Sequence, residues 1–145
     1  KKENTEYRYQ GKKVDAVLVD EAQFLSEAEI DTLSDLVDFY NIPVICYGLR
    51  TDFRNRLFPG SRRLMEIADV IEEVPTVCWC GKRAQCNTRY ANGEIVREGA
   101  QIMLGSNESY VALCRKHYKE GKLWKEAGAE NETSTRRNCK IMEKE

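Results

Sequence analysis

The stretch VDAVLVDEAQFLSEAEIDTLSDLVDFYNIPVICYGL, residues 14–49, decides the fold, because it places a helical pattern between two apolar runs. Residues 14–20 form a short, valine-rich run, which predicts a strand covered on both faces of a sheet. Residues 42–49 form a second run of the same kind. Strand, helix and strand at this length predict a βαβ unit, and therefore a parallel sheet with a right-handed crossover.

The helix between the two runs has a start signal, an apolar face and a stop signal. Ser26 and Glu29 have the spacing of a capping box. Asn41 and Pro43 are expected to end the helix. Apolar residues recur between these limits at helical spacing, at Ile30, Leu33, Val37 and Tyr40. One face of the helix should therefore pack on the sheet.

The segment after the second strand is of interest by its position. Residues 50–60, RTDFRNRLFPG, should form a loop at the carboxyl end of that strand, where open parallel sheets bind ligands. Residues 61–70 predict a helix, and VIEEVPTV at 70–77 predicts a third strand.

The pattern changes after this strand. Asn92-Gly93 predicts a two-residue hairpin turn between strands at 88–91 and 94–98. Residues 108–121 predict a short helix. A charged tail with few apolar residues follows from residue 122 and is expected to be loosely ordered.

Composition indicates a globular protein of 145 residues with 41% apolar and 32% charged side chains. The formal net charge of -1 gives no electrostatic footprint for a protein that coats nucleic acid. The polar start does not fit a signal peptide, and no apolar run approaches the roughly 20 residues needed to cross a bilayer. A cytoplasmic, reducing compartment is therefore expected, in which clustered cysteines favour metal binding or catalysis over disulfides.

Two acidic residues follow the first strand. Asp20 and Glu21 end VLVDE as the carboxylates of a Walker B element do, in which the first acid lies near Mg²⁺ and the second can accept a proton. The alternative is an ordinary acidic turn that closes a strand. A Walker B acid requires a phosphate-binding loop, yet G-x-x-x-x-G-K-[ST] does not occur in these residues.

Three of the six cysteines and the single histidine lie in two closely spaced pairs. Cys78 and Cys80 form C-x-C, while Cys114 and His117, the single histidine, form C-x-x-H. Two such pairs joined by a hairpin predict a closed, structural zinc site of the Cys₃His type. The alternatives are buried thiols with a surface histidine, or a redox pair, for which the spacing is unsuitable. Cys86 is a competing ligand that we expect outside the site, and Cys46 is expected in the core.

Four ordered blocks, VLVDEAQFL, IPVICYGLRTDF, VCWCGKRA and NESYVALCRKHYKEG, resemble the small, zinc-containing, RecA-like thymidine kinases. The resemblance covers residues 14–121. It implies an α/β fold, a P-loop (RecA-like) parallel sheet with a small zinc-binding domain that carries a lasso loop. It also implies a cytoplasmic homotetramer that binds thymidine and ATP with Mg²⁺, with dTTP as a possible feedback inhibitor and no nucleic acid or membrane partner.

The resemblance also implies residue roles. Asp20, Glu21, Ala22 and Gln23 correspond to the nucleotide element, with Glu21 as the catalytic base for the 5′-hydroxyl. Residues 101–106 correspond to the lasso. The expected thymidine contacts are Phe24, Leu49, Phe53, Phe58, Met103, Leu104, Gly105, Ser106 and Tyr110. The expected zinc ligands are Cys78, Cys80, Cys114 and His117, which would tether the lasso.

The chain departs from that family in lacking the phosphate-binding loop, which would precede Lys1. We therefore divide it into the carboxyl-terminal part of a P-loop domain (1–75), a zinc-binding lasso domain (76–121) and the charged tail (122–145). Phosphoryl transfer depends on the charge stabilisation that such a loop supplies. These 145 residues alone are expected not to phosphorylate thymidine.

Two functions of other classes compete with a kinase. A zinc-knuckle module that binds nucleic acid could use the arginines at positions 50, 54, 56, 62 and 63. A RecA-like ATPase could use Glu21 to orient water. The net charge argues against the first, and the apolar residues 49, 53 and 58 beside the site suit a nucleobase better than water.

Overall fold

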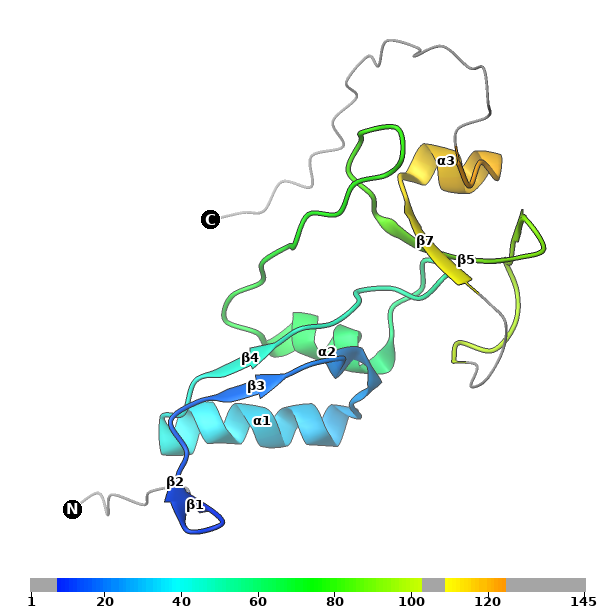
Figure 1. The fold of residues 1–145 in the computed structure, drawn as a ribbon. Helices are drawn as coiled ribbons and strands as arrows, with labels where there is room; N and C mark the ends of the chain where they lie inside the picture. Colours follow the sequence, from blue (N-terminus) through cyan, green and yellow to red (C-terminus); the bar gives the residue numbers. More distant parts are fainter. Residues whose placement is uncertain (1–7, 103–108, 125–145) are drawn as a thin grey trace.

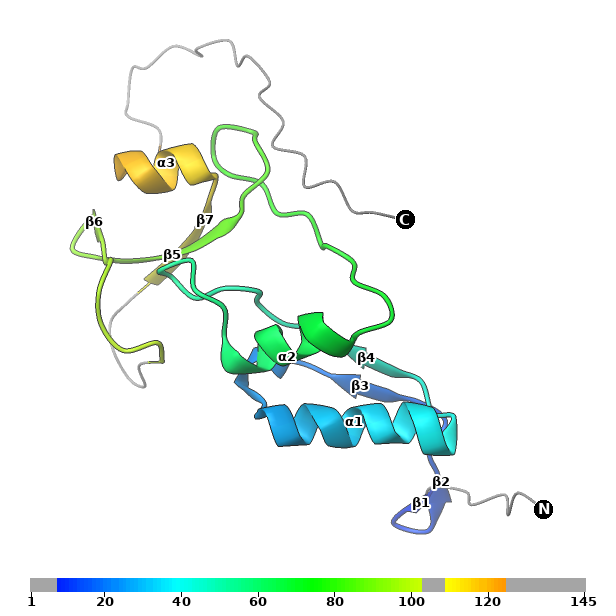
Figure 2. The ribbon, with the colours of Figure 1, turned by 180° about the vertical axis from the view of Figure 1, so that it is seen from behind.

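A computed structural model describes residues 8–102 and 109–124 (Figures 1 and 2). The elements in chain order are β1 (Arg8–Tyr9), β2 (Lys12–Lys13), β3 (Val17–Val19), the 3-10 helix η1 (Ala22–Phe24), α1 (Glu27–Tyr40), β4 (Val44–Cys46), α2 (Pro59–Ile67), β5 (Cys86–Ala91), β6 (Glu94–Ile95), β7 (Ser109–Leu113) and α3 (Arg115–Glu120). Within the described residues, no helix has the length and apolar character that a membrane crossing requires.

The predicted βαβ unit is confirmed. Strands β3 and β4 pair in parallel, with Val17 opposite Val44 and Val19 opposite Cys46. Helix α1 connects them and lies along the pair (Figure 1). The strands are shorter than their apolar runs, because pairing covers three residues of each. We call β3, η1, α1, β4 and α2 the parallel unit.

Helix α1 begins and ends where the sequence predicts. The Ser26 side chain accepts a hydrogen bond from the Glu29 amide, and the Glu29 carboxylate accepts one from the Ser26 amide at 2.8 Å, which completes the capping box. Asn41 adopts the left-handed conformation (φ 55°), and its amide donates to the carbonyl groups of the last turn. Local side-chain chemistry therefore sets both helix ends.

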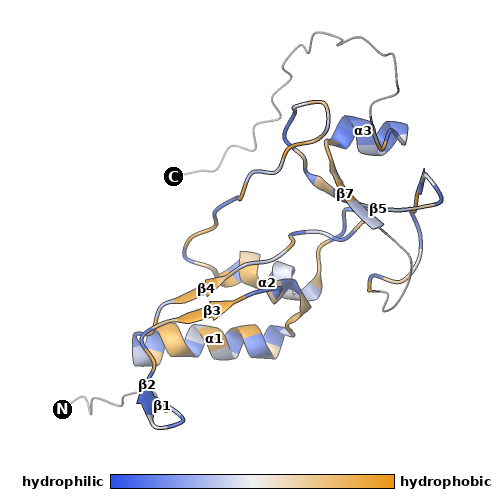
Figure 3. Cartoon of the chain, in the orientation of Figure 1, coloured by the Kyte–Doolittle hydropathy of each residue, from blue (hydrophilic) through white to orange (hydrophobic). Residues whose placement is uncertain are grey.

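The prediction that the strands are covered on both faces is wrong for the described residues. Leu18 and Ile45, at the centres of β3 and β4, remain 69% and 49% exposed, while their neighbours along each strand are half-buried. This alternation means that side chains toward the helices are covered and those on the opposite face are not. Figure 3 shows both strands as continuous hydrophobic segments. A complete P-loop sheet is accordingly not present in residues 8–102 and 109–124.

The third strand predicted at 70–77 is also wrong. This segment is extended but unpaired, except that Val77 forms an isolated bridge with Arg83. Val70 and Val74 are 74% and 76% exposed. An apolar, β-branched composition favours an extended backbone, but a strand also needs a neighbouring edge, and none of the described strands offers one here.

The second half of the chain forms an antiparallel sheet with the strand order β6-β5-β7. The predicted hairpin is confirmed: Asn92 and Gly93 both have positive φ, as a two-residue turn between β5 and β6 requires. The helix predicted at 108–121 is only partly right. Residues 109–113 form β7, which pairs with all but the last residue of β5, and the helix starts at Arg115. Cross-strand pairing overrides the helical pattern there.

A small core holds this antiparallel unit, by which we mean β5, β6, β7, α3 and the turn at 77–83. Three of its buried members are cysteines. The full set is Cys78, Ala84, Cys86, Leu113, Cys114, Tyr118 and Leu123. Leu123 belongs to this core although it lies in the stretch assigned to the tail. The remaining tail, 125–145, is outside the described residues. Few large apolar side chains contribute, so the core needs reinforcement.

Gly60 determines how closely α2 approaches η1. A Cβ atom at this position would lie 2.6 Å from the Leu25 carbonyl oxygen, 2.7 Å from that of Ala22 and 2.8 Å from that of Gln23. These distances are shorter than any ordinary carbon–oxygen contact, and the obstructing atoms are backbone. Glycine is therefore required for α2 to pack here.

Gly60→Ala should lower the free energy of unfolding by about 1–3 kcal/mol, because the methyl group forces α2 away from η1. Urea unfolding followed by circular dichroism measures the change. Arg62→Ala, on an exposed position of the same helix, is the control and should alter stability by about 0.5 kcal/mol or less. Equal stability of Gly60→Ala and the parent would contradict the close approach.

Candidate active site and metal centre

The acidic turn lies at the carboxyl end of β3. Asp20 and Glu21 are both exposed, and the Asp20 carboxylate accepts a hydrogen bond of 2.9 Å from the Glu21 amide. Glu21 has the left-handed backbone conformation, with φ 53°. Such a conformation is uncommon for a glutamate and is found preferentially in functional turns. The turn therefore differs from a routine strand ending, and it presents two carboxylates to solvent.

The buried side chain of Gln23 orients the Glu21 carboxylate. Its side chain is 1% exposed, its Nε2 donates to the Glu21 carboxylate, and its Oε1 accepts a hydrogen bond of 3.1 Å from the Leu49 amide. A Cβ atom on Gly48 would lie 2.6 Å from this Oε1, so glycine allows the approach. The buried amide therefore connects the ends of β3 and β4 and fixes the direction of the Glu21 carboxylate.

The ends of β3 and β4 are also joined through the backbone. The Ala22 amide donates to the Tyr47 carbonyl at 2.9 Å, and Ala22 itself is fully buried. Leu49 accepts a hydrogen bond of 2.6 Å from the Ser61 hydroxyl on α2. The four residues predicted as the nucleotide element, 20–23, thus form one rigid turn next to Leu49.

The predicted aromatic residues fall into two groups. Phe24 is 53% exposed and contacts the buried Phe58 edge to face, with ring centroids 5.7 Å apart. Phe53 is 1% exposed and lies against the antiparallel unit, where Tyr110 is half-exposed on β7. Leu49 and Phe24 therefore present apolar surface near the acidic turn, whereas Phe53 supports the loop from inside.

Part of the predicted site lies outside the described residues. Met103, Leu104, Gly105 and Ser106 belong to 103–108, which the structure does not describe. The lasso loop and its contacts to a base therefore stay a prediction.

Asp52 organises the loop between β4 and α2, and the sequence reasoning missed it. The carboxylate is buried and accepts hydrogen bonds from the amides of Arg54 and Arg56, from the Arg54 guanidinium and from Gln101 Nε2. Burial alone would raise the pKa of Asp52, but these hydrogen bonds together outweigh it and lower the pKa. The sequence does contain one indication: an aspartate in a loop can accept a hydrogen bond from the amide two residues later, here that of Arg54, which is the pattern of an Asx turn.

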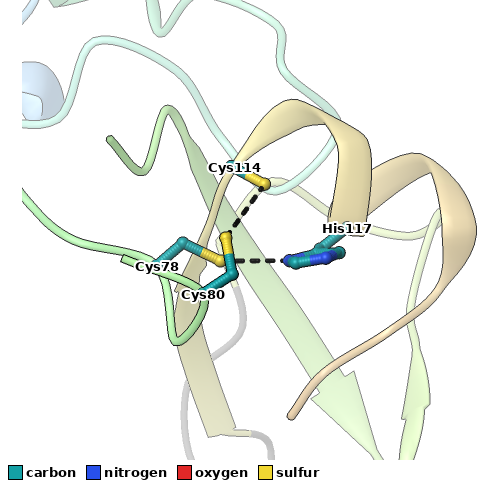
Figure 4. A group of neighbouring side chains, drawn as sticks. All are labelled: Cys78, Cys80, Cys114 and His117. Atoms are coloured by element: carbon teal, nitrogen blue, oxygen red, sulfur yellow. Dashed lines mark hydrogen bonds between the residues drawn. The ribbon is translucent and has the colours of Figure 1, made fainter. Parts of the chain in front are cut away.

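The four predicted zinc ligands come together (Figure 4). The Sγ atoms of Cys78, Cys80 and Cys114 and a ring nitrogen of His117 all lie within 4.8 Å of one another. Cys78 and Cys80 come from the turn that precedes β5. Cys114 is the N-cap of α3, and His117 lies in its first turn. We call these four residues the Cys₃His cluster.

The distances in the cluster suit a tetrahedral metal site. Cys80 Sγ and Cys114 Sγ are 4.0 Å apart, and Cys78 Sγ is 3.4 Å from His117 Nδ1. Ligand bonds of typical zinc length, arranged tetrahedrally, give about 3.8 Å between two sulfurs and about 3.6 Å between sulfur and nitrogen. The sulfur separation is also far too long for a disulfide. The cluster could therefore hold a metal ion such as zinc.

The turn that carries the first pair is tightly built. The Cys78 amide donates to the Lys82 carbonyl at 2.8 Å, and the Gly81 amide donates to the Cys78 carbonyl at 2.8 Å. Gly81 has φ +82°, a conformation that glycine adopts without strain. Gly81 therefore lets the chain turn at the cluster.

The surroundings of the cluster favour the metal-binding forms of His117 and Cys78, whereas burial raises the pKa of Cys80. Burial lowers the pKa of His117, which keeps the imidazole neutral, the form that binds metals. Burial opposes ionisation of Cys78, but hydrogen bonds from Cys80 and Cys114 outweigh it and lower the pKa of this thiol. A thiolate is the ligand form of cysteine.

Trp79 is a residue near the cluster that the sequence reasoning missed. Its indole stacks on the His117 ring, with centroids 4.0 Å apart and planes 8° from parallel, and its Nε1 donates to the Lys122 carbonyl. The stacking fixes the orientation of the imidazole. Cys86 is buried in the same core but lies outside the cluster, as expected, and Cys46 is half-buried on β4.

Cys114→Ser should reduce bound zinc from about one ion per chain to a small fraction, because three ligands hold the metal far less tightly than four. Dialysis against zinc-free buffer followed by elemental mass spectrometry measures the content. Cys86→Ala is the matched control, a buried thiol of the same core outside the cluster. Zinc retained by Cys114→Ser, or lost from Cys86→Ala, would refute the ligand set.

Asp52→Asn should destabilise the protein at neutral pH, and the difference from the parent should shrink in acid. Because the folded pKa of Asp52 is lowered, its stabilising contribution is complete above the ordinary aspartate pKa of about 3.9 and is lost as the pH falls through the folded value. Urea unfolding at neutral pH and below about pH 4 tests this. Asp69→Asn, at an exposed position, controls for the loss of one charge. A pH-independent difference would contradict the assignment.

Comparison with known proteins supports the resemblance on which the ligand and site residues rest. The model of the family described as thymidine kinase matches residues 1–118. Thymidine kinase from Haemophilus influenzae (strain ATCC 51907 / DSM 11121 / KW20 / Rd) is 55% identical over 109 residues, which are 74% of this chain and 56% of that protein. Thymidine kinase from Legionella pneumophila (strain Paris) is 50% identical over 121 residues, 83% of this chain and 58% of that protein.

A third relative, thymidine kinase from Pasteurella multocida (strain Pm70), is 53% identical over 105 residues, 72% of this chain and 55% of that protein. The chain thus spans a little more than half the length of these relatives. The family match covers most of the chain and includes all four residues of the Cys₃His cluster. This chain is therefore a member of the thymidine kinase family.

Proposed function

We propose that the complete polypeptide containing this chain transfers the γ-phosphoryl group of ATP to the 5′-hydroxyl of thymidine, giving dTMP for pyrimidine salvage and DNA synthesis. The observation that carries the proposal is the acidic turn in a member of this family. Glu21, in a left-handed conformation at the tip of β3, is held by the buried Gln23 amide, which also holds Leu49. This arrangement supports a fixed base beside an apolar surface.

Glu21 is the proposed catalytic base. It accepts the proton of the 5′-hydroxyl while that oxygen bonds to the γ-phosphorus, and the bond from the γ-phosphorus to the bridging oxygen of ADP breaks. Gln23 donates to the Glu21 carboxylate and so directs it. A carboxylate that has to rotate freely would spend much of its time away from the hydroxyl, so this orientation supports catalysis.

Asp20 is the residue proposed to hold Mg²⁺ of the nucleotide. Its exposed carboxylate at a strand tip supplies the hard oxygen ligands that Mg²⁺ prefers. The bound ion would neutralise charge on the phosphates. The sequence contains no G-x-x-x-x-G-K-[ST], so we expect the phosphate cradle outside these 145 residues and no kinase activity from them alone.

The proposed thymine pocket uses the apolar surface near the turn. Phe24, Leu49 and Phe58 lie around η1 and the start of α2, and Phe53 supports the same loop. The lasso at 101–106, including residues 103–106, and Tyr110 are proposed to close over the base from the antiparallel unit. An apolar wall with a few polar groups suits a nucleobase.

The Cys₃His cluster is proposed to bind structural zinc. Four ligands leave no open position on the ion for water or substrate, so the metal would supply no chemistry to the reaction. Its proposed role is to hold the turn before β5 to the start of α3 in a unit with a small core. Cytoplasmic location, a homotetramer and inhibition by dTTP are further parts of the proposal, taken from the family resemblance.

The rival functions are less well supported. Two of the arginines that could contact nucleic acid are engaged by acids: Arg54 pairs with Asp52 at 2.8 Å, and Arg63 pairs with Asp31 at 2.7 Å and with Glu66. Arginines neutralised in this way contribute little to a phosphate-binding surface. An ATPase acting on water would not need the apolar surface of Phe24 and Leu49 beside its base.

Glu21→Gln in the full-length gene product should lower kcat by about 10²–10⁴ and change KM for thymidine little, because a base acts mainly in the transition state. Coupled measurement of thymidine-dependent ADP release gives both constants. Glu27→Gln, an exposed glutamate in the first turn of α1, is the control and should leave both constants unchanged. Parallel losses in kcat and thymidine affinity would contradict the role as base, and ADP release that ignores thymidine would favour an ATPase.

A further inference from the structure

Arg89 is the largest fully buried side chain in the part of the chain that the structure describes. It lies on β5, in the centre of the antiparallel sheet, with an exposed fraction of 0%. Burying a guanidinium is costly unless hydrogen bonds and charge interactions compensate for the lost hydration. None of the chemistry proposed above uses this residue, so its burial calls for another explanation.

Within the described residues, the guanidinium donates hydrogen bonds to three separate acceptors. Nη1 donates to the Ala100 carbonyl at 3.0 Å, Nη2 donates to the Gln101 carbonyl at 3.2 Å, and Nε donates to the Tyr110 hydroxyl at 2.9 Å. A planar fork with donors in fixed directions can hold two consecutive carbonyl groups and a side chain at once. Arg89 thereby fixes the backbone at 100–101 relative to β5 and β7.

The same guanidinium covers Phe53. Its central carbon lies 3.8 Å from the ring centroid of Phe53, which is 1% exposed. At this distance a cation is attracted to the face of the ring, and the attraction is stronger in a buried site. Phe53 belongs to the loop between β4 and α2, whose ends are Leu49 and Phe58. Arg89 therefore contacts both that loop and the segment at 100–101.

Two further hydrogen bonds join the same regions. Gln101 Nε2 donates to Asp52 at 3.1 Å, and the Tyr118 hydroxyl donates to the Phe53 carbonyl at 3.0 Å. The loop after β4 is thus bound at two successive residues, at the Asp52 carboxylate by Gln101 and at the Phe53 carbonyl by Tyr118. Among these contacts of the described residues, those of Arg89 combine the Phe53 ring with the backbone of residues 100 and 101.

We propose that Arg89 is a positioning residue that sets nucleoside affinity in this protein. It does not contact the substrate; it aligns two walls of the pocket, the Phe53 loop and the backbone at residues 100–101, against each other. This inference rests on the proposed function, because the pocket is the proposed thymidine site. The antiparallel sheet next to the proposed zinc site would then contribute to thymidine binding through one buried side chain.

The reaction leaves the thymine ring unchanged, which predicts where the effect appears. Contacts to a non-reacting base are equally strong in the ground state and the transition state, so weakening them raises KM with little effect on kcat. A general loss of folded enzyme would instead lower the apparent kcat and leave KM unchanged. The two outcomes separate positioning from simple stability.

The test compares Arg89→Met and Arg89→Lys with the parent in the full-length gene product. Arg89→Met removes every donor and the charge, and it should raise KM for thymidine about tenfold or more, with kcat within about twofold and KM for ATP unchanged. Arg89→Lys keeps the charge near Phe53 but cannot reach three acceptors as a fork, so it should give an intermediate KM. Arg83→Met, which removes an exposed ion pair with Glu73 in the same unit, is the control.

Hydrogen–deuterium exchange supplies a readout that does not depend on activity. Amides at 99–102 should exchange faster in both Arg89 variants while the zinc content stays unchanged. If Arg89→Met does not fold, Arg89→Lys decides: it keeps the charge, loses part of the fork and should still raise KM for thymidine and the exchange rates at 99–102. An unchanged KM in the folded variants, or a KM no higher than that of Arg83→Met, would overturn the proposal.

The proposed function can fail separately. A full-length parent protein without thymidine-dependent ADP release would refute the kinase proposal. In that case the exchange rates at 99–102 still show whether Arg89 holds this segment, and slow exchange unaffected by Arg89→Lys would refute the positioning role as well.

Discussion

Four side chains from two distant parts of the chain converge within 4.8 Å at one end of the β5–β7 pair, the end at which Cys86 lies opposite Leu113. Cys78 and Cys80 precede β5, while Cys114 and His117 follow β7, so one metal ion bound there would hold the whole antiparallel unit together. The apolar core of that unit is small and contains two of the ligands, Cys78 and Cys114, while Cys80 packs against it. A metal ion bound here would therefore fix the start of β5 against the end of β7.

Strand β5 and the loop after β4 connect the cluster to the acidic turn. Arg89 on β5 covers Phe53, and the loop containing Phe53 leads back to Leu49 at the end of β4. The Leu49 amide is bound by Gln23, which also binds Glu21. The Cys₃His cluster and the proposed catalytic carboxylate are thus linked through β5 and buried polar side chains rather than through a shared apolar core. Such groups tolerate little displacement, because a buried donor or acceptor that loses its partner is costly.

The sequence predicted those parts of the fold whose causes are local. The capping box of α1, its stop at Asn41 and the Asn92-Gly93 hairpin depend on residues a few positions apart, and all are confirmed. The prediction failed for segments whose secondary structure depends on a pairing partner far away in the sequence. Residues 70–77 have strand composition but no neighbouring edge among the described strands, and residues 109–113 pair with β5 rather than continue α3 backwards.

The candidate ligands and the candidate base were predictable from the sequence, since tight spacing and a strand-end acidic pair are properties of neighbouring residues. The tertiary structure alone decided which polar residues hold the site. Asp52 and Gln101 are 49 positions apart, and Arg89 binds Tyr110 across 21 residues. An arginine, an aspartate or a glutamine in a sequence is expected on the surface, and only the folded chain can bring the partners that make burial favourable. Chain topology, not residue type, therefore converts these three residues from ordinary polar side chains into the internal supports of the proposed pocket.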